Sequence, residues 1–160
     1  MRGREQEALF GIVIYEGVEP IDIGGTVGVL SMAQRVVPGV RCVTIAERAG
    51  PVRLAGGLSV IAQTSFSDAP SCAQILVCGG PGWRTETKNP AMLSFLKRAP
   101  AARVGSVCTG ALILGASGLL DGRMATTRRL AVGTETVAPL TLSPGSGGVP
   151  GHVVRIRGFD

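Results

Sequence analysis

The chain has 160 residues, of which 45% are hydrophobic and 17% are charged, and its net charge is +5. This length suits one domain with a substantial core, and the high apolar content excludes an intrinsically disordered chain. Aromatic residues make up only 4% of the chain and the basic residues are scattered along it. We therefore expect no specific nucleic-acid partner, because neither a base-stacking platform nor a basic cluster is present.

The cysteines bear on metal binding and on the compartment. They stand at positions 42, 72, 78 and 108 without a Cys-x-x-Cys pair, and the chain has a single histidine. This pattern argues against a zinc site, and we expect neither a metal nor an organic cofactor. The apolar run near the N-terminus is too short for a membrane span or a secretion signal. We expect a cytoplasmic protein with free thiols and no membrane partner.

The first half of the chain predicts strands alternating with a helix. Residues 8–15 form a continuous apolar run, which is typical of a strand buried on both faces of a parallel sheet. A helix is predicted over 20–37, although three glycines weaken its first half. A second strand follows over 40–46. Residues 52–54 and 58–62 flank an Ala-Gly-Gly turn and predict a small hairpin.

The second half continues this alternation. The predicted elements are a strand over 73–78, a helix over 90–99 capped by Asn89, a strand over 102–107, a helix over 109–117, a short strand over 124–127, a weaker helix over 129–139 and a last strand within 152–156. Strands that alternate with helices indicate βαβ units. The sequence therefore predicts an α/β domain with an open, mostly parallel sheet.

One cysteine lies at the junction between a predicted strand and a predicted helix. Residues 105–110 are Gly-Ser-Val-Cys-Thr-Gly, and a sharp turn at Cys108 needs a small neighbour such as Gly110. The helix dipole would favour the thiolate form of Cys108, and the amide of Thr109 could face an anion. We predict that Cys108 is a nucleophile on a strand-to-helix turn. The alternative is an inert, buried thiol.

Five segments together resemble a known family. They are Val107-Cys-Thr-Gly-Ala-Leu-Ile-Leu, the run from Ala116 to Thr127, Ile14-Tyr-Glu-Gly-Val-Glu-Pro-Ile-Asp-Ile, Ala55-Gly-Gly-Leu-Ser-Val and Val77-Cys-Gly-Gly-Pro-Gly. Taken in chain order, they resemble the ThiJ/PfpI superfamily of class I glutamine amidotransferase-like folds. The similarity is greatest to isonitrile hydratases and to the sensing domains of AraC-type regulators. It implies a flavodoxin-like, three-layer open sheet with a cysteine nucleophile elbow over residues 8–142.

The resemblance also implies roles for individual residues. Cys108 matches the nucleophile, and Asp22 matches the acid that lies near the thiol in the hydratases. Gly80 matches a glycine whose amide joins that of Thr109 in an oxyanion-type pocket for substrate. For Asp22 alone, a carboxylate that merely stabilises the first helical turn is the alternative. The implied activity is that of a cysteine-dependent isonitrile hydratase, a lyase that adds water to an isonitrile to give an N-substituted formamide.

Other functions remain open. The chain could be a non-catalytic domain that senses a small molecule, related to AraC-type regulators, or a truncated, inactive relative. No helix-turn-helix pattern follows residue 142. In each case the expected partner is a small-molecule substrate or ligand, and a homodimer is a further expectation because relatives commonly dimerise.

The sequence also departs from the family pattern. Gly28 stands where relatives usually carry an acidic residue near the thiol, and Arg128 stands where a histidine often follows. Cys78 replaces a frequent proline; we consider both a redox-sensitive pair with Cys108 and a packed thiol. Residues 143–160 form an atypical Gly/Pro/Ser-rich tail in place of the strand and long helix found in relatives, so we interpret the C-terminal part as incomplete.

Overall fold

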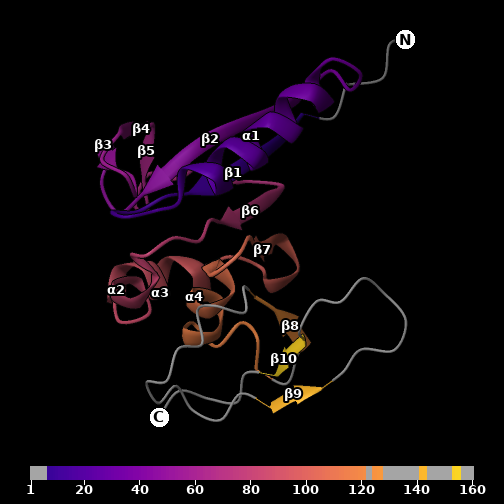
Figure 1. The fold of residues 1–160 in the computed structure, drawn as a ribbon. Helices are drawn as coiled ribbons and strands as arrows, with labels where there is room; N and C mark the ends of the chain where they lie inside the picture. The colour runs from indigo at the N-terminus through magenta and orange to yellow at the C-terminus, as the bar shows by residue number, and fades with distance from the viewer. Residues whose placement is uncertain (1–6, 122–123, 128–140, 144–152, 156–160) are drawn as a thin grey trace.

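The central sheet is formed by five strands in the order β5-β2-β1-β6-β7, and every neighbouring pair is parallel. Its strands are β1 (Ala8–Val13), β2 (Val40–Ala46), β5 (Thr64–Ser65), β6 (Gln74–Val77) and β7 (Val104–Ser106). The computed structural model describes residues 7–121, 124–127, 141–143 and 153–155 (Figure 1). The predicted α/β fold with a mostly parallel sheet is confirmed.

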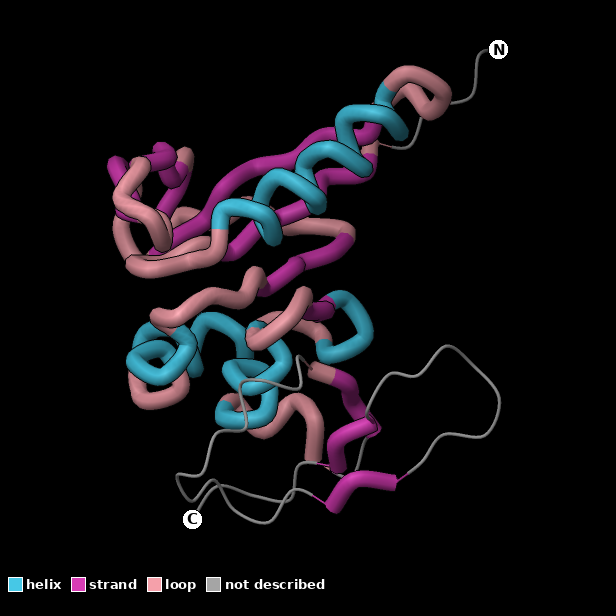
Figure 2. The backbone as a smooth tube through the Cα atoms, in the orientation of Figure 1, coloured by secondary structure: helices cyan, strands magenta, loops and turns pink. Residues whose placement is uncertain are grey.

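Helices cover both faces of this sheet. They are α1 (Pro20–Gln34), α2 (Trp83–Glu86), α3 (Pro90–Arg98) and α4 (Gly110–Ala116). Because right-handed crossovers run outward from β1 in opposite directions, α1 and the pair α2–α3 lie on opposite faces. Helix α4 contacts α2, α3, β6 and β7, so it lies on the same face of the sheet as α2 and α3. Figure 2 shows α1 running along β1 and β2, with the other helices grouped away from it.

The core lies between the sheet and these helical layers. Ile12 and Val13 in β1 and Ile14 just after it are completely buried, as expected for the middle strand of a parallel sheet. On the face covered by α2, α3 and α4, the side chains of Ile113 in α4 and Leu96 in α3 are also completely buried. This double burial explains why the first strand is apolar at nearly every position.

Several predicted boundaries need correction. Helix α1 ends at Gln34 rather than residue 37, and residues 101–103 form a 3-10 turn rather than the start of the next strand. The α3 cap is confirmed, because the Asn89 side chain accepts a hydrogen bond of 3.0 Å from the amide of Ala91. The short elements α2 and β5 were not predicted. A single helical turn and a two-residue strand leave no periodic pattern to detect.

Two smaller sheets complete the described structure. The predicted hairpin is β3 (Gly50–Arg53) paired antiparallel with β4 (Ser59–Ala62). The predicted strands near residues 124 and 154 are β8 (Met124–Thr126) and β10 (Val153–Arg155), which pair antiparallel. The unpredicted β9 (Thr141–Ser143) joins them on the other side of β10. The helix predicted over 129–139 lies outside the described residues. In the part of the chain that is described, no helix is both long and apolar enough to cross a membrane.

Candidate functional site

The candidate site lies at the carboxyl edge of the central sheet, where three loops meet. The amide of Glu19, after β1, donates to the carbonyl of Gly79, after β6, at 2.8 Å. The amide of Val107, after β7, donates to the carbonyl of Val77 at 2.9 Å. Strand β1 has β2 on one side and β6 on the other, so the strand order reverses here. Open α/β sheets bind ligands at such a reversal.

Cys108 occupies the turn between β7 and α4. Its φ is +53°, which places it in the left-handed region, and no other non-glycine residue in the described ranges has a positive φ. This conformation costs an L-residue about 1–2 kcal/mol, so the surrounding structure must enforce it. Its side chain is half-buried, and its carbonyl accepts a 2.9 Å hydrogen bond from the Thr127 hydroxyl. The predicted sharp turn is therefore present.

Gly110 shows why the turn needs a small residue. A Cβ atom at this position would clash with the carbonyl oxygen of Val77 and lie 3.1 Å from that of Cys78. Both contacts are with backbone, which cannot move aside without disturbing β6. The glycine two residues after the thiol lets α4 begin against the end of the neighbouring strand.

Thr109 and Gly80 are in direct contact. The amide of Gly80 donates to the Thr109 hydroxyl oxygen at 2.9 Å, and Thr109 is only 6% exposed. The resemblance implied instead that the Gly80 amide would face a substrate together with the Thr109 amide. Here the Gly80 amide hydrogen is already used in the bond to the Thr109 hydroxyl oxygen. The hydrogen of the Thr109 hydroxyl remains available to donate. The Thr109 amide has no acceptor within the described backbone.

Asp22 points from the first turn of α1 to the loop after β6. Its Oδ2 accepts a 2.9 Å hydrogen bond from the amide of Gly79, and the residue is 8% exposed. A Cβ atom at Gly79 would lie 2.9 Å from that oxygen and 2.6 Å from the Thr109 amide nitrogen. Asp22, Gly79 and Thr109 are thus brought together. The Asp22 carboxylate lies in the first turn of α1 and also accepts a hydrogen bond from the loop after β6.

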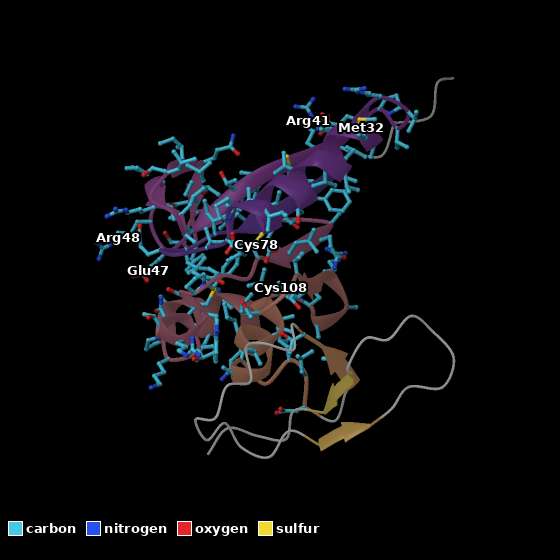
Figure 3. All side chains as sticks on the ribbon, viewed as in Figure 1. Met32, Arg41, Glu47, Arg48, Cys78 and Cys108 are labelled. Atoms are coloured by element: carbon cyan, nitrogen blue, oxygen red, sulfur yellow. The ribbon has the colours of Figure 1, made fainter. Side chains whose placement is uncertain are left out.

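Cys78 lies at the end of β6 and is completely buried. Burial, with a further contribution from the negative charge of Asp22, raises its pKa to about 12, although a hydrogen bond with Thr26 lowers it. Cys78 is therefore a protonated thiol at neutral pH. Figure 3 labels it and Cys108 near the middle of the molecule; both are free thiols. A buried, protonated Cys78 favours the packed-thiol interpretation over the redox-sensitive pair.

Two contributors to the site were missed by the sequence analysis. The hydroxyl of Tyr15 donates to the carbonyl of Cys78 at 2.8 Å, and this fixes the end of β6. Burial raises the pKa of Tyr15, with smaller effects from the charges of Cys78, Glu86, Asp22 and Cys108, so Tyr15 is a neutral donor. Thr127 was missed too. The position of the single tyrosine at the end of an apolar run could have drawn attention to it.

The family departure at Gly28 has a simple structural context. The residue is exposed, and a Cβ atom there would have no other atom within 4 Å. A Cβ added at this position would therefore lie in open space. Arg128 lies outside the described residues. Among the described side chains, no group of three or more His, Cys, Asp or Glu is placed to hold a metal ion.

This geometry joins a half-buried thiol to a set of polar groups held by backbone contacts. Thr109 can offer an amide hydrogen and a hydroxyl hydrogen, and Asp22 can accept or deliver a proton. Preorganised donors beside a nucleophile are the requirement for stabilising charge that develops during covalent addition.

Known proteins resemble this chain over most of its length. Residues 9–135 match the model of the DJ-1/PfpI family. The isonitrile hydratase of Pseudomonas putida is 35% identical over 119 residues, which cover 73% of this chain and 50% of the hydratase. The HTH-type transcriptional regulator GlxA of Rhizobium meliloti is 34% identical over 84 residues, covering 51% of this chain and 26% of the regulator. The chain thus spans half the length of the hydratase and about a quarter of the regulator.

A solved structure supports the fold as well. The crystal structure of a ThiJ/PfpI family protein from Pseudomonas syringae superposes with a TM-score of 0.62 at 26% identity, covering 72% of this chain and 48% of that protein. The elbow, the parallel sheet and the matched residues lead to one conclusion: the chain belongs to the DJ-1/PfpI family.

Proposed function

We propose that the protein is a cysteine-dependent hydratase of isonitriles, with Cys108 as the nucleophile. The observation that carries the proposal is the left-handed φ of +53° at this half-buried thiol, which is retained despite its energetic cost. The similarity to an isonitrile hydratase supplies the substrate class. The reaction is the addition of water to an isonitrile to give an N-substituted formamide.

The proposed chemistry has two stages. The Cys108 thiolate attacks the terminal carbon of the isonitrile, a C–S bond forms, and the carbon receives a proton to give a thioimidate. Water then adds to that carbon and gives one proton to Asp22. The second proton of the water passes to the substrate nitrogen as the C–S bond breaks, so the formamide leaves and the thiolate is regenerated. Asp22 delivers the first proton and accepts one from water, which is general acid–base catalysis by a positioned carboxyl group. Atoms balance as one isonitrile plus one water.

Thr109 and Gly80 stabilise the intermediate in this proposal. Because the Gly80 amide already donates to the Thr109 hydroxyl, the hydroxyl hydrogen is directed away from Gly80. It can donate to the substrate nitrogen as charge develops there, together with the Thr109 amide. Gly80 then acts through Thr109 and has no contact with the substrate.

The test is turnover of cyclohexyl isonitrile, measured as the appearance of the formamide. We expect Cys108→Ser to lower kcat at least about 1000-fold, since loss of a nucleophile leaves only binding. Asp22→Asn should lower it by about 100-fold or more if the carboxyl group transfers protons. Cys42→Ala, on the half-buried side of β2, is the matched thiol control and should keep wild-type activity. A wild-type protein without turnover would refute the proposal for this substrate class.

A second candidate is a ligand-sensing domain, and the similarity to the regulator GlxA favours it. Such a domain would bind a small molecule at the same sheet edge without converting it. A saturable rise in melting temperature with ligand concentration, without any product, would support sensing over catalysis. We place either function in the cytoplasm, because a reducing compartment preserves the four free thiols.

We also propose that two copies associate through the outer face of α1. Asp22 is the only charged residue in this helix and it is buried. The outer face exposes Ile21, Val29 and Met32, which are 75%, 71% and 57% accessible. A helix that is apolar all around normally packs against other structure on more than one side. Because the outer face of α1 carries no charge, two copies of this cationic chain can meet there without repulsion between charged side chains. Val29→Lys should convert a dimer to a monomer in analytical ultracentrifugation, while Leu58→Lys on the hairpin loop should not.

A further inference from the structure

A separate cavity opens at the amino edge of the sheet, opposite the edge that carries Cys108. It has a volume of about 300 Å³ and uses residues immediately before two strands, Cys72 before β6 and Arg103 before β7. The end of α3 supplies Arg98 to the same cavity. No part of the proposed hydratase chemistry uses these residues.

The floor of this cavity is apolar and aromatic. Phe66 and Phe95 are stacked with ring centroids 4.5 Å apart and planes inclined by 11°. Both are buried, as is Ile75 beside them, with exposed fractions of 7%, 6% and 8%. Pro70 and Pro100 form stiff parts of the wall. The aromatic and proline side chains give one side of this open cavity an apolar surface on which a flat apolar group can pack, while Ser67 and Ser71 add polar groups to the lining.

The rim of the cavity is cationic. Arg98 donates from Nη2 to the carbonyl of Phe66 at 3.1 Å, which orients its guanidinium group. Arg103 is exposed, and neither arginine forms an ion pair within the described part of the chain. None of the described residues lining the cavity carries a carboxylate. The nearby carboxylate of Asp68 is already bonded to the hydroxyls of Ser65 and Ser67.

These charges decide the sign of the ligand. The carbonyl end of α3 contributes about half a negative charge and the nearby Asp68 contributes one, whereas the two guanidinium groups contribute two positive charges. The net field at the rim therefore favours an anion. Guanidinium groups bind carboxylates with paired, charge-assisted hydrogen bonds.

We propose that this cavity binds a small aromatic carboxylate, with its ring against Phe66 and Phe95 and its carboxylate between Arg98 and Arg103. The bound carboxylate would lie near Arg103, which precedes β7 at the amino edge of the sheet, whereas the thiol lies at the carboxyl edge. The site is thus a second ligand site that neither competes with nor depends on the hydratase reaction.

The experiment titrates phenylacetate and its neutral counterpart phenylacetamide into the ¹⁵N-labelled full chain and follows amide shifts by NMR. Saturable shifts at Cys72 and Ala99 with phenylacetate are expected. Phenylacetamide should bind at least about tenfold more weakly, because it loses the charge-assisted bonds. Arg103→Gln should weaken phenylacetate binding by about tenfold and leave the affinity for phenylacetamide unchanged.

Two controls separate this site from other causes. Arg35→Gln removes the same charge outside the cavity and should not alter phenylacetate affinity, and Cys108→Ser should bind phenylacetate like the wild type. Equal affinity for the acid and the amide would overturn the proposal. An effect of Arg35→Gln as large as that of Arg103→Gln, or shifts confined to residues near Cys108, would overturn it as well.

Discussion

The carboxyl ends of β6 and β7 are adjacent and each carries a cysteine, yet the two thiols have opposite properties. Cys78 continues from β6, is completely buried and has a raised pKa. Cys108 follows β7, is half-buried and has a φ of +53°. The residue type is the same and the strands are hydrogen-bonded neighbours. The difference shows that the local backbone path, and not the cysteine itself, makes a candidate nucleophile.

The largest expected difference between these two strand ends is in alkylation by iodoacetamide. At pH 8 a thiol with a pKa near 12 is ionised in only about one molecule in ten thousand. We expect Cys108 to be labelled in the folded protein while Cys78 reacts at least about 1000-fold more slowly than in urea. The Cys78 rate should still rise with every pH unit up to pH 10, because its pKa lies higher. Peptide mass spectrometry measures both thiols together, and rapid labelling of Cys78 at pH 7 would contradict its burial.

Gly110→Ala should disrupt the point where the two strand ends meet. The added methyl group would clash with the Val77 carbonyl, so we expect a loss of about 3 kcal/mol in unfolding free energy. Gly24→Ala is the control, because its Cβ would have no other atom within 4 Å. Within helix α1 that change should stabilise by about 0.5–1 kcal/mol. Urea denaturation measures the unfolding free energy of both variants. Equal changes would show that Gly110 does not lie as close to the Val77 carbonyl as described.

Cys108→Gly sharpens the comparison by removing the strain of the β7 turn. Glycine adopts a positive φ without a steric cost, which offsets its greater flexibility in the unfolded chain. We expect the unfolding free energy to stay equal or rise by up to about 1 kcal/mol while activity is lost. Cys42→Gly, in β2, should instead destabilise the protein by about 1 kcal/mol or more. If both changes destabilised equally, the turn would hold no strain.

The smallest effect is expected beyond the β6 end, at Glu86 of α2. Burial raises the pKa of this carboxyl group, the charge of Glu47 raises it further, and its hydrogen bond from Asn89 lowers it. Because the folded state holds the proton more tightly than the unfolded state, stability falls as the pH rises through the folded pKa. Glu86→Gln keeps an acceptor for Asn89 and should gain stability relative to wild type between pH 4 and pH 7. The measurement is the unfolding free energy of both proteins at several pH values. If the difference between them stayed constant from pH 4 to pH 7, the raised pKa of Glu86 would be contradicted.

Much of the fold and part of the site follow from the sequence. Apolar runs identify β1 and β6, because strands inside a parallel sheet need apolar residues at most positions, and Asn89 identifies the start of α3. Cys108 and its turn are readable because glycines flank the thiol. The bonds of Asp22 to Gly79 and of Gly80 to Thr109 could not be predicted, since they join segments separated by 57 and 29 residues. Tyr15 and Thr127 were missed for the same reason.

The order of the sheet has a consequence for how the protein is synthesised. The middle strand β1 is made first, but its partner β6 pairs Leu76 with Ile12 across 64 residues, and β7 comes later still. Contacts between such distant segments slow folding, because a long loop must close before they form. The apolar middle strand therefore emerges from the ribosome well before its neighbours on one side. Chaperones that bind exposed apolar segments would have their longest access at residues 8–15, and the thiol turn would form after β1, β2 and β6.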